Sequence, residues 1–436
     1  MVPSPPGALP ALPGAAGAVV AACSGGLDST VLLHRLAADA AIRARGLRAL
    51  HVHHGLHPRA DEWADHCRAQ CAALDVPLRV ERVHVDHGAG LGPEAAARVA
   101  RHAAFAAALG PGEVIALAHH RDDQAETFLL RALRASGPGG LAAMRPWRRF
   151  AAGWMWRPLL DEPRAALETW ARERGLAWIE DPANADPAHA RSLLRHRLMP
   201  LLRGRWPGAD AAFARSAALC AEAEAVLDDH DQALVDLLLQ GDGAASGALP
   251  LAGLRPLPPA VRARVLRAWA ARAGLPPLPA AGVRAIDAML GARRDRQAEF
   301  RWAGAAVRAW RGALHPLDAP VGAAPADWSL DWDGRAPLAL PPGGRLALVG
   351  AGGFERTVRV HARRGGERLR LPGRAHSHAL KHLLQDAAVP PWERARMPLL
   401  SAPDGSLLAA GDALLSGVLH DWLAARGARL EWTRLA

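Results

Sequence analysis

Near the start of the chain, one stretch combines the residue types that an anion-binding loop needs. It follows an apolar run and precedes a helix-like run, so the expected order is strand, tight turn and helix. The first turn of a helix leaves backbone N–H groups without partners, and the helix dipole favours negative charge there. Glycines at positive φ let the backbone approach an anion, hydroxyls add donors, and an aspartate can hold a Mg²⁺ that bridges phosphates. The stretch reads Cys23-Ser24-Gly25-Gly26-Leu27-Asp28-Ser29-Thr30, and we expect both glycines to have positive φ.

A strand-to-helix turn capped by Asp28 or Ser24 is the simpler interpretation of this stretch. The complete S-G-G-x-D-S pattern after an apolar strand favours the phosphate site instead. No lysine follows the glycines, so the loop differs from the lysine-containing P-loop. The phosphate charge must then be met by backbone N–H groups, magnesium and arginines.

A second polar group opens another predicted helix at 119–127, with the sequence His-His-Arg-Asp-Asp-Gln-Ala-Glu-Thr. Asp122 is the expected N-cap. Asp123 and Glu126 are three positions apart, so their carboxylates share one helical face and can converge on one point. Hard oxygen ligands beside a phosphate loop favour Mg²⁺ over zinc. The alternative is a capped helix start whose acidic side chains are solvated.

The elements around these turns predict an α/β fold with a doubly wound parallel sheet, because strands and helices alternate. Strands are expected at 18–22, 47–54, 76–84 and 113–120, each followed by a helix. Ligands of such sheets bind beyond the carboxyl ends of the strands, so the two polar turns should lie at one edge. At the same edge, His53 or His54 can stack on or hydrogen-bond an adenine, or can be an ordinary strand-end histidine.

Composition bounds the partners and the compartment. The 436 residues carry a formal net charge of +10, and Lys381 is the only lysine among 53 basic residues. This excess permits a polyanionic partner, although a solvated arginine surface explains it equally well. Four cysteines are too few for a disulfide framework, so we expect a cytoplasmic protein, and no apolar span is long enough for a membrane. Cys67 and Cys71, four apart on a predicted helix, are interpreted as buried thiols rather than metal ligands.

Four segments are expected: a disordered lead-in at 1–16, the α/β domain at 17–216, a mainly helical middle domain at 217–345 and a small α+β domain at 350–436. In the middle domain we expect helices at 259–273 and 282–290 and a strand-like stretch at 298–314. In the last domain, residues 355–396 hold ten basic and four acidic residues, and 405–415 reads as a closing hairpin. The basic run is either a nucleic-acid contact or a solvated face.

The S-G-G-x-D-S loop resembles the signature of the PP-loop ATP pyrophosphatases, which cleave ATP to AMP and pyrophosphate. Later motifs resemble one branch of that superfamily, the tRNA(Ile)-lysidine synthetases. These motifs are His51–Leu56, His119–Thr127, Ser136–Met144, Arg157–Leu160 and Glu180–Asn184, followed by Arg191, Arg195 and Pro200. Ser192 occupies a position where that family usually has asparagine.

The resemblance implies a ligase that joins free L-lysine to C2 of the wobble cytidine in tRNA(Ile) with a CAU anticodon. In that family the cytidine O2 attacks the α-phosphorus of ATP, pyrophosphate leaves, and the lysine ε-amine then displaces AMP to give lysidine. The resemblance places ATP on Ser24, Gly25, Gly26, Leu27, Asp28, Ser29 and His53. It implies a Mg²⁺ held by Asp28 and Asp123.

Further roles also come from the resemblance. Glu94 and Glu126 are expected to receive the lysine ammonium or its protons. The arginines expected to neutralise phosphates of ATP or the anticodon loop are Arg98, Arg101, Arg191 and Arg195. Arg368, Arg374 and Lys381 are expected to contact tRNA phosphates. A homodimer is an assembly that the sequence leaves open.

Three other functions use parts of the same pattern. A tRNA thiolase on the same fold would use paired cysteines, and no C-x-x-C is present. An amidotransferase-type synthetase of small molecules would need a glutaminase domain or another ammonia source. A non-catalytic RNA-binding protein would leave Asp28, Asp123 and Glu126 without a purpose.

Overall fold

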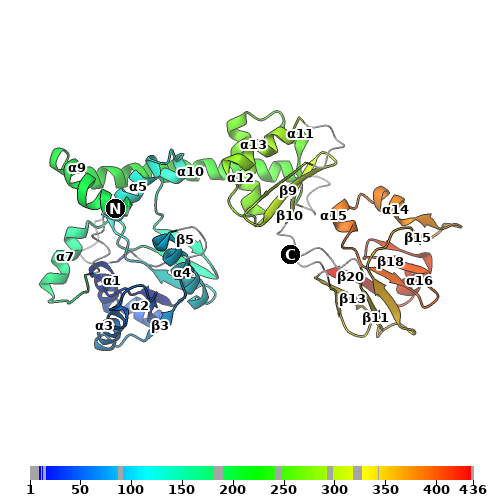
Figure 1. The fold of residues 1–436 in the computed structure, drawn as a ribbon, viewed down its shortest axis with the longest axis horizontal. Helices are drawn as coiled ribbons and strands as arrows, with labels where there is room; N and C mark the ends of the chain where they lie inside the picture. Colours follow the sequence, from blue (N-terminus) through cyan, green and yellow to red (C-terminus); the bar gives the residue numbers. More distant parts are fainter. Residues whose placement is uncertain are drawn as a thin grey trace. The chain divides into compact units, whose positions relative to one another are not determined.

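The computed structural model describes residues 9, 10, 12, 16–86, 92–180, 190–240, 247–291, 298–317, 327–341 and 343–433. The chain forms two compact units, Met1–Leu227 and Asp228–Ala436 (Figure 1). The expected boundary after residue 216 lies inside α10 (Ala209–Leu239), and the two compact units also divide within this helix.

A six-stranded sheet in the order β3-β2-β1-β4-β6-β5 organises the first unit. Its strands are β1 (Val19–Ala22), β2 (Leu47–His53), β3 (Leu78–Arg82), β4 (Val114–Ala116), β5 (Trp147–Phe150) and β6 (Gly153–Trp156). All neighbouring pairs are parallel except β5 with β6. The doubly wound parallel sheet is therefore confirmed. The order reverses at β1, which has β2 on one side and β4 on the other.

Along the chain, the helices of this unit lie between the strands of the sheet and after its last strand. They are α1 (Leu27–Ala38), α2 (Ala40–Arg45), α3 (Ala60–Ala73), α4 (Pro93–Ala108), α5 (Arg121–Ala132), α6 (Pro138–Leu141), α7 (Arg164–Glu173), α8 (Ala190–Leu193) and α9 (Met199–Arg205), with a π-helical turn at Leu194–Leu198. Side chains alternate along β1, so Val19 and Ala21 belong to one apolar cluster and Val20 to another. Both faces of the strand are buried, as its unbroken apolar run requires.

Several expected strands are shorter than the sequence pattern. The stretches 76–84 and 113–120 form strands only at Leu78–Arg82 and Val114–Ala116. The β5–β6 hairpin was not expected; the Trp147 and Trp156 rings stack across it with centroids 5.3 Å apart. Leu9 and Leu12, which fall in the expected disordered lead-in, are partly buried against the cluster under β1.

The middle part of the second unit combines helices with a four-stranded sheet. The helices are the end of α10, α11 (Leu251–Leu254), α12 (Pro259–Arg272) and α13 (Ala280–Met289), close to the expected positions. The sheet order is β7 (Leu249–Pro250), β10 (Ala313–Leu317), β9 (Ala305–Trp310) and β8 (Glu299–Trp302). The single strand-like stretch expected at 298–314 is thus three strands, because Ala303-Gly304 and Arg311-Gly312 adopt positive φ and turn the chain back.

The last part of the chain is α+β, as expected. Its larger sheet has the order β11 (Ser329–Trp332), β14 (Val358–His361), β17 (Leu399–Ser401), β18 (Leu407–Ala410) and β19 (Leu414–Leu415). Smaller sheets join β12 (Leu338–Ala339), β13 (Arg345–Val349) and β20 (Arg429–Thr433), and β15 (Arg368–Leu369) with β16 (His378–Ala379). The helices are α14 (Leu380–Asp386), α15 (Pro391–Arg394) and α16 (Gly417–Ala424).

Two details of this part matter for the expectations. The hairpin expected at 405–415 forms between β18 and β19, but α16 and β20 follow it, so it does not close the fold. Because β13 pairs with β20, residues before 350 belong to the same folded part. Within the described residues, no helix has the length and apolar character that crossing a membrane requires.

Candidate active site

The loop after β1 has the backbone geometry of an anion site. Gly25 has φ +83°, and a Cβ there would lie 2.8 Å from Ile179 Cδ1 and 3.2 Å from Cys67 Sγ, so only glycine fits. Gly26 has φ −76° and is the extended N-cap of α1, so the expectation of positive φ is wrong for this residue. No side chain caps α1 in the described structure, which leaves the N–H groups of its first turn to a ligand.

Hydrogen bonds within the loop fix its shape. The buried Ser29 hydroxyl donates to the Gly26 carbonyl oxygen over 3.0 Å and accepts from the Ser24 N–H over 3.2 Å. The two serine hydroxyls are 3.0 Å apart. From outside, the Ile179 N–H donates to the Gly25 carbonyl oxygen over 2.8 Å. The loop is thus pre-organised before any ligand binds.

The turn after β4 begins α5 differently from the sequence expectation. His120, not Asp122, is the N-cap residue, with Nδ1 3.4 Å from the Asp123 N–H. Asp122 is needed elsewhere, since its Oδ2 accepts from the Arg164 N–H over 3.0 Å at the start of α7. Its Oδ1 accepts from Arg203 Nη2 over 3.1 Å. Asp122 therefore ties α5 to α7 and α9.

Three carboxylates surround the His120 ring, which is 1% exposed. Nε2 lies 3.3 Å from Asp123 Oδ2 and 3.7 Å from Asp28 Oδ2, and Nδ1 lies 3.7 Å from Asp122 Oδ2. Burial alone would lower the pKa of His120, but its hydrogen bonds to Asp122 and Asp28 and the charge of Asp123 raise that pKa to about 10. The positive charge of the imidazolium thus lies between the carboxylate of Asp28 in the loop and the carboxylates of Asp122 and Asp123 in α5, and it offsets part of their negative charge. When Nδ1 carries a proton, it pairs with Asp122 and no longer accepts from the Asp123 N–H.

Asp123 and Glu126 converge, as their spacing predicts, and Arg195 bridges them. Arg195 Nε donates to Glu126 Oε1 over 2.7 Å, and Nη2 donates to Asp123 Oδ1 over 2.9 Å and to Glu126 Oε2 over 3.0 Å. Burial raises the pKa of Glu126 although Arg195 opposes this, whereas the charges of His120 and Arg195 outweigh burial and lower the pKa of Asp123. Arg191, one turn earlier, donates from Nη2 to Thr127 Oγ1 over 2.9 Å.

The wall of the site beside β4 contains a half-buried, neutral histidine, His119. Burial lowers the pKa of His119 to about 3. Arg157 Nε lies 3.3 Å from His119 Nδ1, and its Nη1 donates to the Arg145 carbonyl oxygen over 2.7 Å. Burial and two nearby arginines lower the pKa of Arg157 to about 10. This guanidinium therefore brings positive charge to the edge of the sheet.

The remaining expected residues of the first unit differ in position. His53 is buried, and its Nε2 lies 3.2 Å from Asp61 Oδ1 and 3.4 Å from Arg82 Nη1, so surface charges orient this ring. Arg98 and Arg101 lie exposed on α4, and their charges help to lower the pKa values of His119 and His54 respectively. The side chain of Glu94 lies outside the described residues, as do residues 181–184 of the Glu180–Asn184 motif.

Arg368, Arg374 and Lys381 belong to the second unit and are exposed. Arg368 is held by Ser377, donating from Nε to Oγ over 3.1 Å and from Nη2 to the carbonyl oxygen over 2.6 Å. All three residues belong to the second unit, whereas Asp28 belongs to the first.

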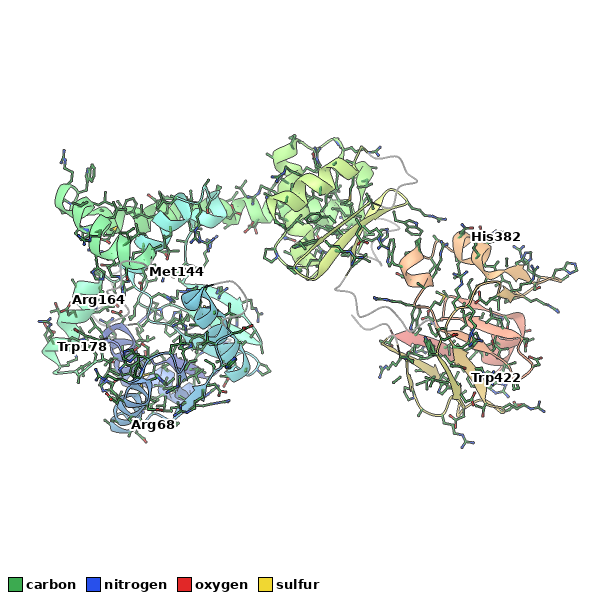
Figure 2. The ribbon with its side chains drawn as sticks, viewed as in Figure 1. Arg68, Met144, Arg164, Trp178, His382 and Trp422 are labelled. Carbon is green, nitrogen blue, oxygen red and sulfur yellow. The ribbon has the colours of Figure 1, made fainter. Side chains whose placement is uncertain are left out.

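Sequence reasoning gave no role to three residues that the structure brings into the site. His120 joins Asp28 to Asp123, and the adjacent pair of histidines before an acidic helix start was the available signal. Arg164 Nε lies 3.8 Å from Asp28 Oδ1 (Arg164 is labelled in Figure 2), and Arg203 reaches Asp122. These two arginines come from later helices, and nothing in the local sequence marks them.

The cysteines near the loop are free and buried, as predicted for Cys67 and Cys71. Cys67 Sγ lies 3.4 Å from His51 Nδ1, which in turn lies 2.9 Å from the Cys23 carbonyl oxygen. These buried contacts hold Cys23, at the start of the loop, in place. The described residues contain no cluster of three or more His, Cys, Asp or Glu side chains arranged to hold a metal ion.

Comparison with known proteins identifies the family. Three family models match: a PP-loop domain at residues 11–202, a TilS substrate binding domain at 249–315 and a TilS substrate C-terminal domain at 358–432. The tRNA(Ile)-lysidine synthase of Xanthomonas axonopodis pv. citri is 56% identical over 98% of this chain and 96% of its own length. The chain belongs to the tRNA(Ile)-lysidine synthase family.

Other synthases of the family are also similar along most of their length. Those of Xylella fastidiosa (strain Temecula1) and Salmonella paratyphi B are 53% and 43% identical, covering 97% and 90% of this chain and 97% and 92% of their own. Among solved structures, a U34-tRNA thiolase from Methanococcus maripaludis matches 47% of this chain and 72% of its own at 17% identity, with a TM-score of 0.39. Membership of the PP-loop family implies that ATP is a substrate.

Proposed function

We propose that the protein ligates lysine to C2 of the wobble cytidine in tRNA(Ile) with a CAU anticodon, forming AMP and pyrophosphate from ATP. Full-length similarity to tRNA(Ile)-lysidine synthases is the observation that carries this proposal. The site supports it, because the loop after β1 and the carboxylates after β4 flank the point where the strand order reverses. Open α/β sheets bind their ligands at that point.

ATP is proposed to bind with its pyrophosphate portion on the loop. The donors are the N–H groups at the start of α1 and the Ser24 hydroxyl, and the Ser29 hydroxyl can donate to a phosphate in place of the Gly26 carbonyl oxygen. Gly25 turns the loop at φ +83°, Gly26 is the N-cap of α1, and Leu27 anchors the helix start because it is 4% exposed. His53, at the end of β2, is proposed to lie near the adenine.

The residues fit a Mg²⁺ that binds together with the nucleotide. Asp28 and Asp123 contact the same nitrogen of His120, and buried Asp28 Oδ1 has no hydrogen-bond partner in the described structure. One or two carboxylates plus phosphate oxygens and water is the usual environment of Mg²⁺ in such sites, so the lack of a closed protein cage agrees with this role. The ion would neutralise charge on the phosphate oxygens as pyrophosphate leaves.

Lysine is proposed to present its ammonium group to Glu126, with Glu94 as a second acceptor. In the structure Arg195 already makes the contacts that such a cation would seek, since it pairs with both Glu126 and Asp123. The raised pKa of Glu126 suits a group that takes a proton from the ε-amine before attack on C2. When the lysine ammonium takes the place of Arg195 on Glu126, the Arg195 guanidinium is free to contact a phosphate oxygen.

Arginines are proposed to balance the charge that develops at the α-phosphate. Arg191 and Arg195 approach from the helical segment after residue 190, and Arg98 and Arg101 from α4. The wobble base must leave its stack to reach this edge, which is how proteins read single-stranded RNA. Arg368, Arg374 and Lys381 are proposed to contact other phosphates of the tRNA. We expect the enzyme to act in the cytoplasm. The sequence leaves a homodimer open as its assembly.

The test is a reconstituted reaction. Purified protein, tRNA(Ile) transcript, ATP and lysine should give a tRNA nucleoside heavier by one lysine minus water, detected by mass spectrometry of the digested tRNA. Omission of lysine should leave pyrophosphate release without lysidine. If the tRNA gained sulfur from a sulfur donor instead, the thiolase alternative would replace this proposal.

A further inference from the structure

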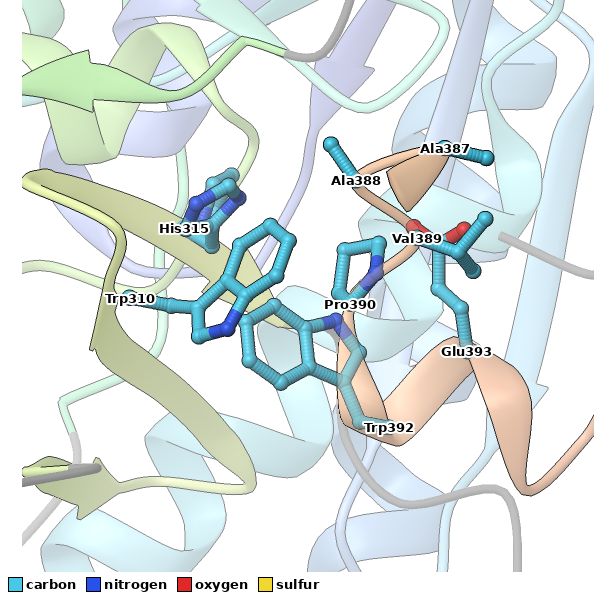
Figure 3. Close-up of a pocket in the computed structure, with 9 residues that line it drawn as sticks. Trp310, His315, Ala387, Ala388, Val389, Pro390, Trp392 and Glu393 are labelled. Atoms are coloured by element: carbon cyan, nitrogen blue, oxygen red, sulfur yellow. The ribbon is translucent and has the colours of Figure 1, made fainter. Parts of the chain in front are cut away.

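A cavity of about 370 Å³ lies in the second unit and is lined by residues to which the proposed function assigns no role (Figure 3). Its aromatic lining comes from Trp310 and His315 of the β9–β10 hairpin and from Trp392 of α15. The chain 387–390 between α14 and α15 supplies small and aliphatic lining. The volume falls in the range of small-ligand pockets, about 300–1,000 Å³, so the cavity has room for one small planar group and not for a helix.

The hairpin register explains why these side chains gather. Arg308 is directly opposite His315, and Trp310 is opposite Ala313, so they share one face of the hairpin. Val307 and Leu314 are sequence neighbours of these residues and therefore point to the other face. Both are completely buried in the core of the middle part. The alternation that buries one face therefore presents rings and a guanidinium on the other.

The three rings pack edge to face and leave flat apolar surface around the cavity. Ring centroids are 5.8 Å apart for Trp310 and Trp392, 5.3 Å for His315 and Trp392, and 5.6 Å for Trp310 and His315. Burial lowers the pKa of His315, so near neutral pH its ring is an uncharged aromatic group. Such rings are the surfaces on which proteins stack nucleobases.

Arginines frame the rings. The Arg308 guanidinium lies 4.9 Å from the Trp392 ring centroid, and that of Arg311 lies 5.0 Å from the Trp310 centroid. Arg311 Nη2 donates to the Gln385 carbonyl oxygen and Arg394 Nε to the Val389 carbonyl oxygen, each over 2.7 Å. Carbonyl oxygens orient Arg311 and Arg394 without cancelling their charge, whereas Arg308 is paired with the carboxylate of Glu299.

The charges are also close enough to affect one another. Burial and the charges of Arg363 and Arg311 lower the pKa of Arg394. Cations that repel one another in this way are stabilised by an anion placed between them. The cavity therefore combines a flat aromatic wall with one lining carboxylate, Glu393, and with the charges of Arg311 and Arg394 near its edge.

We propose that this cavity binds one unpaired nucleotide of an RNA, with the base against Trp392 and the 5′ or 3′ phosphate beside Arg311 and Arg394. The proposal rests on the proposed function, because it takes the RNA to be the tRNA substrate. A tRNA has two sources of such a nucleotide: its single-stranded 3′ end and the unpaired bases of its loops. Stacking on the rings supplies affinity with little dependence on sequence.

The test compares Trp392→Ala, Trp392→Phe and wild type in binding to a tRNA(Ile) transcript at fixed salt. Base stacking on an aromatic ring is worth enough that Trp392→Ala should weaken binding on the order of 10-fold. Trp392→Phe keeps an aromatic face and should recover most of the affinity. Trp422→Ala is the matched control, since Arg426 covers the Trp422 ring at 4.3 Å in a similar tryptophan–arginine pair outside the cavity (Trp422 is labelled in Figure 2).

A second transcript without the single-stranded 3′ nucleotides identifies the source. If Trp392→Ala and wild type bind the trimmed tRNA equally, the nucleotide comes from the 3′ end. If the variant remains about 10-fold weaker, it comes from a loop, and both results support the cavity as a nucleotide site. Equal binding of the intact tRNA by folded Trp392→Ala and wild type would overturn the inference and leave a protein segment as the alternative occupant. Wild type that neither binds tRNA nor forms lysidine would instead refute the proposed function.

Discussion

At the scale of single residues, Asp28 is the sharpest test of the site. Its side chain is 30% exposed at the start of α1, and it contacts His120 and Arg164 only at 3.7 and 3.8 Å. Asp28→Asn keeps the volume but removes the charge, so pyrophosphate release should fall by at least about 100-fold while the melting temperature changes little. Asp65→Asn, on the exposed face of α3, is the control and should retain full activity. Near-normal turnover of folded Asp28→Asn would exclude a role for this carboxylate in the chemistry.

His120 gives a pH-dependent prediction for the protein without ligands. Its pKa in the folded state is about 10, above the ordinary histidine value of 6.5, so folding binds a proton there. This stabilisation is complete below about pH 6.5 and is lost as the pH rises through about 10. Urea unfolding should therefore show a free energy of unfolding that decreases from about pH 7 to about pH 9.5.

His120→Asn separates this effect from general alkaline loss. Asparagine is a good N-cap, so α5 should still begin correctly, but the side chain does not titrate. The variant is expected to have a lower stability near neutral pH and a smaller decrease toward alkaline pH. Parallel decreases for wild type and variant would assign the pH dependence to other groups.

At the scale of elements, the close contact between β4 and β6 depends on Gly153. A Cβ at this position would lie 2.1 Å from the Glu113 carbonyl oxygen, a backbone atom that cannot move aside. Gly153→Ala should therefore destabilise the first unit by about 3 kcal/mol, the upper part of the range for overpacking. Thermal unfolding of the variant provides the measurement. Gly175→Ala, where no atom lies within 4 Å of the added Cβ but φ is +62°, is the control for conformational cost alone.

The sequence predicted elements whose signals are local. The strand, loop and first helix at 19–38 and the acidic start of α5 could be read from neighbouring residues, because apolar runs, glycines and caps act over a few positions. The β5–β6 hairpin could not, since its short strands lack a clear alternating pattern. Arg195 was expected at the site, but its pairing with Glu126, 69 positions away, depends on the π-helical turn that carries it. Tertiary contacts of this kind leave no local pattern.

At the scale of the whole molecule, the residues proposed to carry out the chemistry and the basic run proposed to bind tRNA phosphates belong to different units of the chain. The loop, the carboxylates and their arginines all belong to Met1–Leu227, and the exposed basic run at 355–396 belongs to Asp228–Ala436. Each unit has its own apolar clusters, so a surface substitution in one should leave the fold of the other intact. This separation makes tRNA binding and ATP chemistry independently testable.

The salt dependence of tRNA binding tests whether the basic run contacts tRNA phosphates. Arg368, Arg374 and Lys381 are exposed, so their joint replacement by alanine should not disturb the core. Each lost phosphate contact lowers the slope of log affinity against log salt by about 0.7–0.9, so the triple variant should lose about two units of slope if all three bind phosphates. Arg335, Arg345 and Arg429, also exposed in the same part of the chain, form a control triple with the same change in net charge. Binding measured at several salt concentrations should give the control a slope near that of wild type, and pyrophosphate release at saturating tRNA should be unchanged in both. Identical slopes for the two triples would show that net charge alone, and not these three side chains, attracts the tRNA.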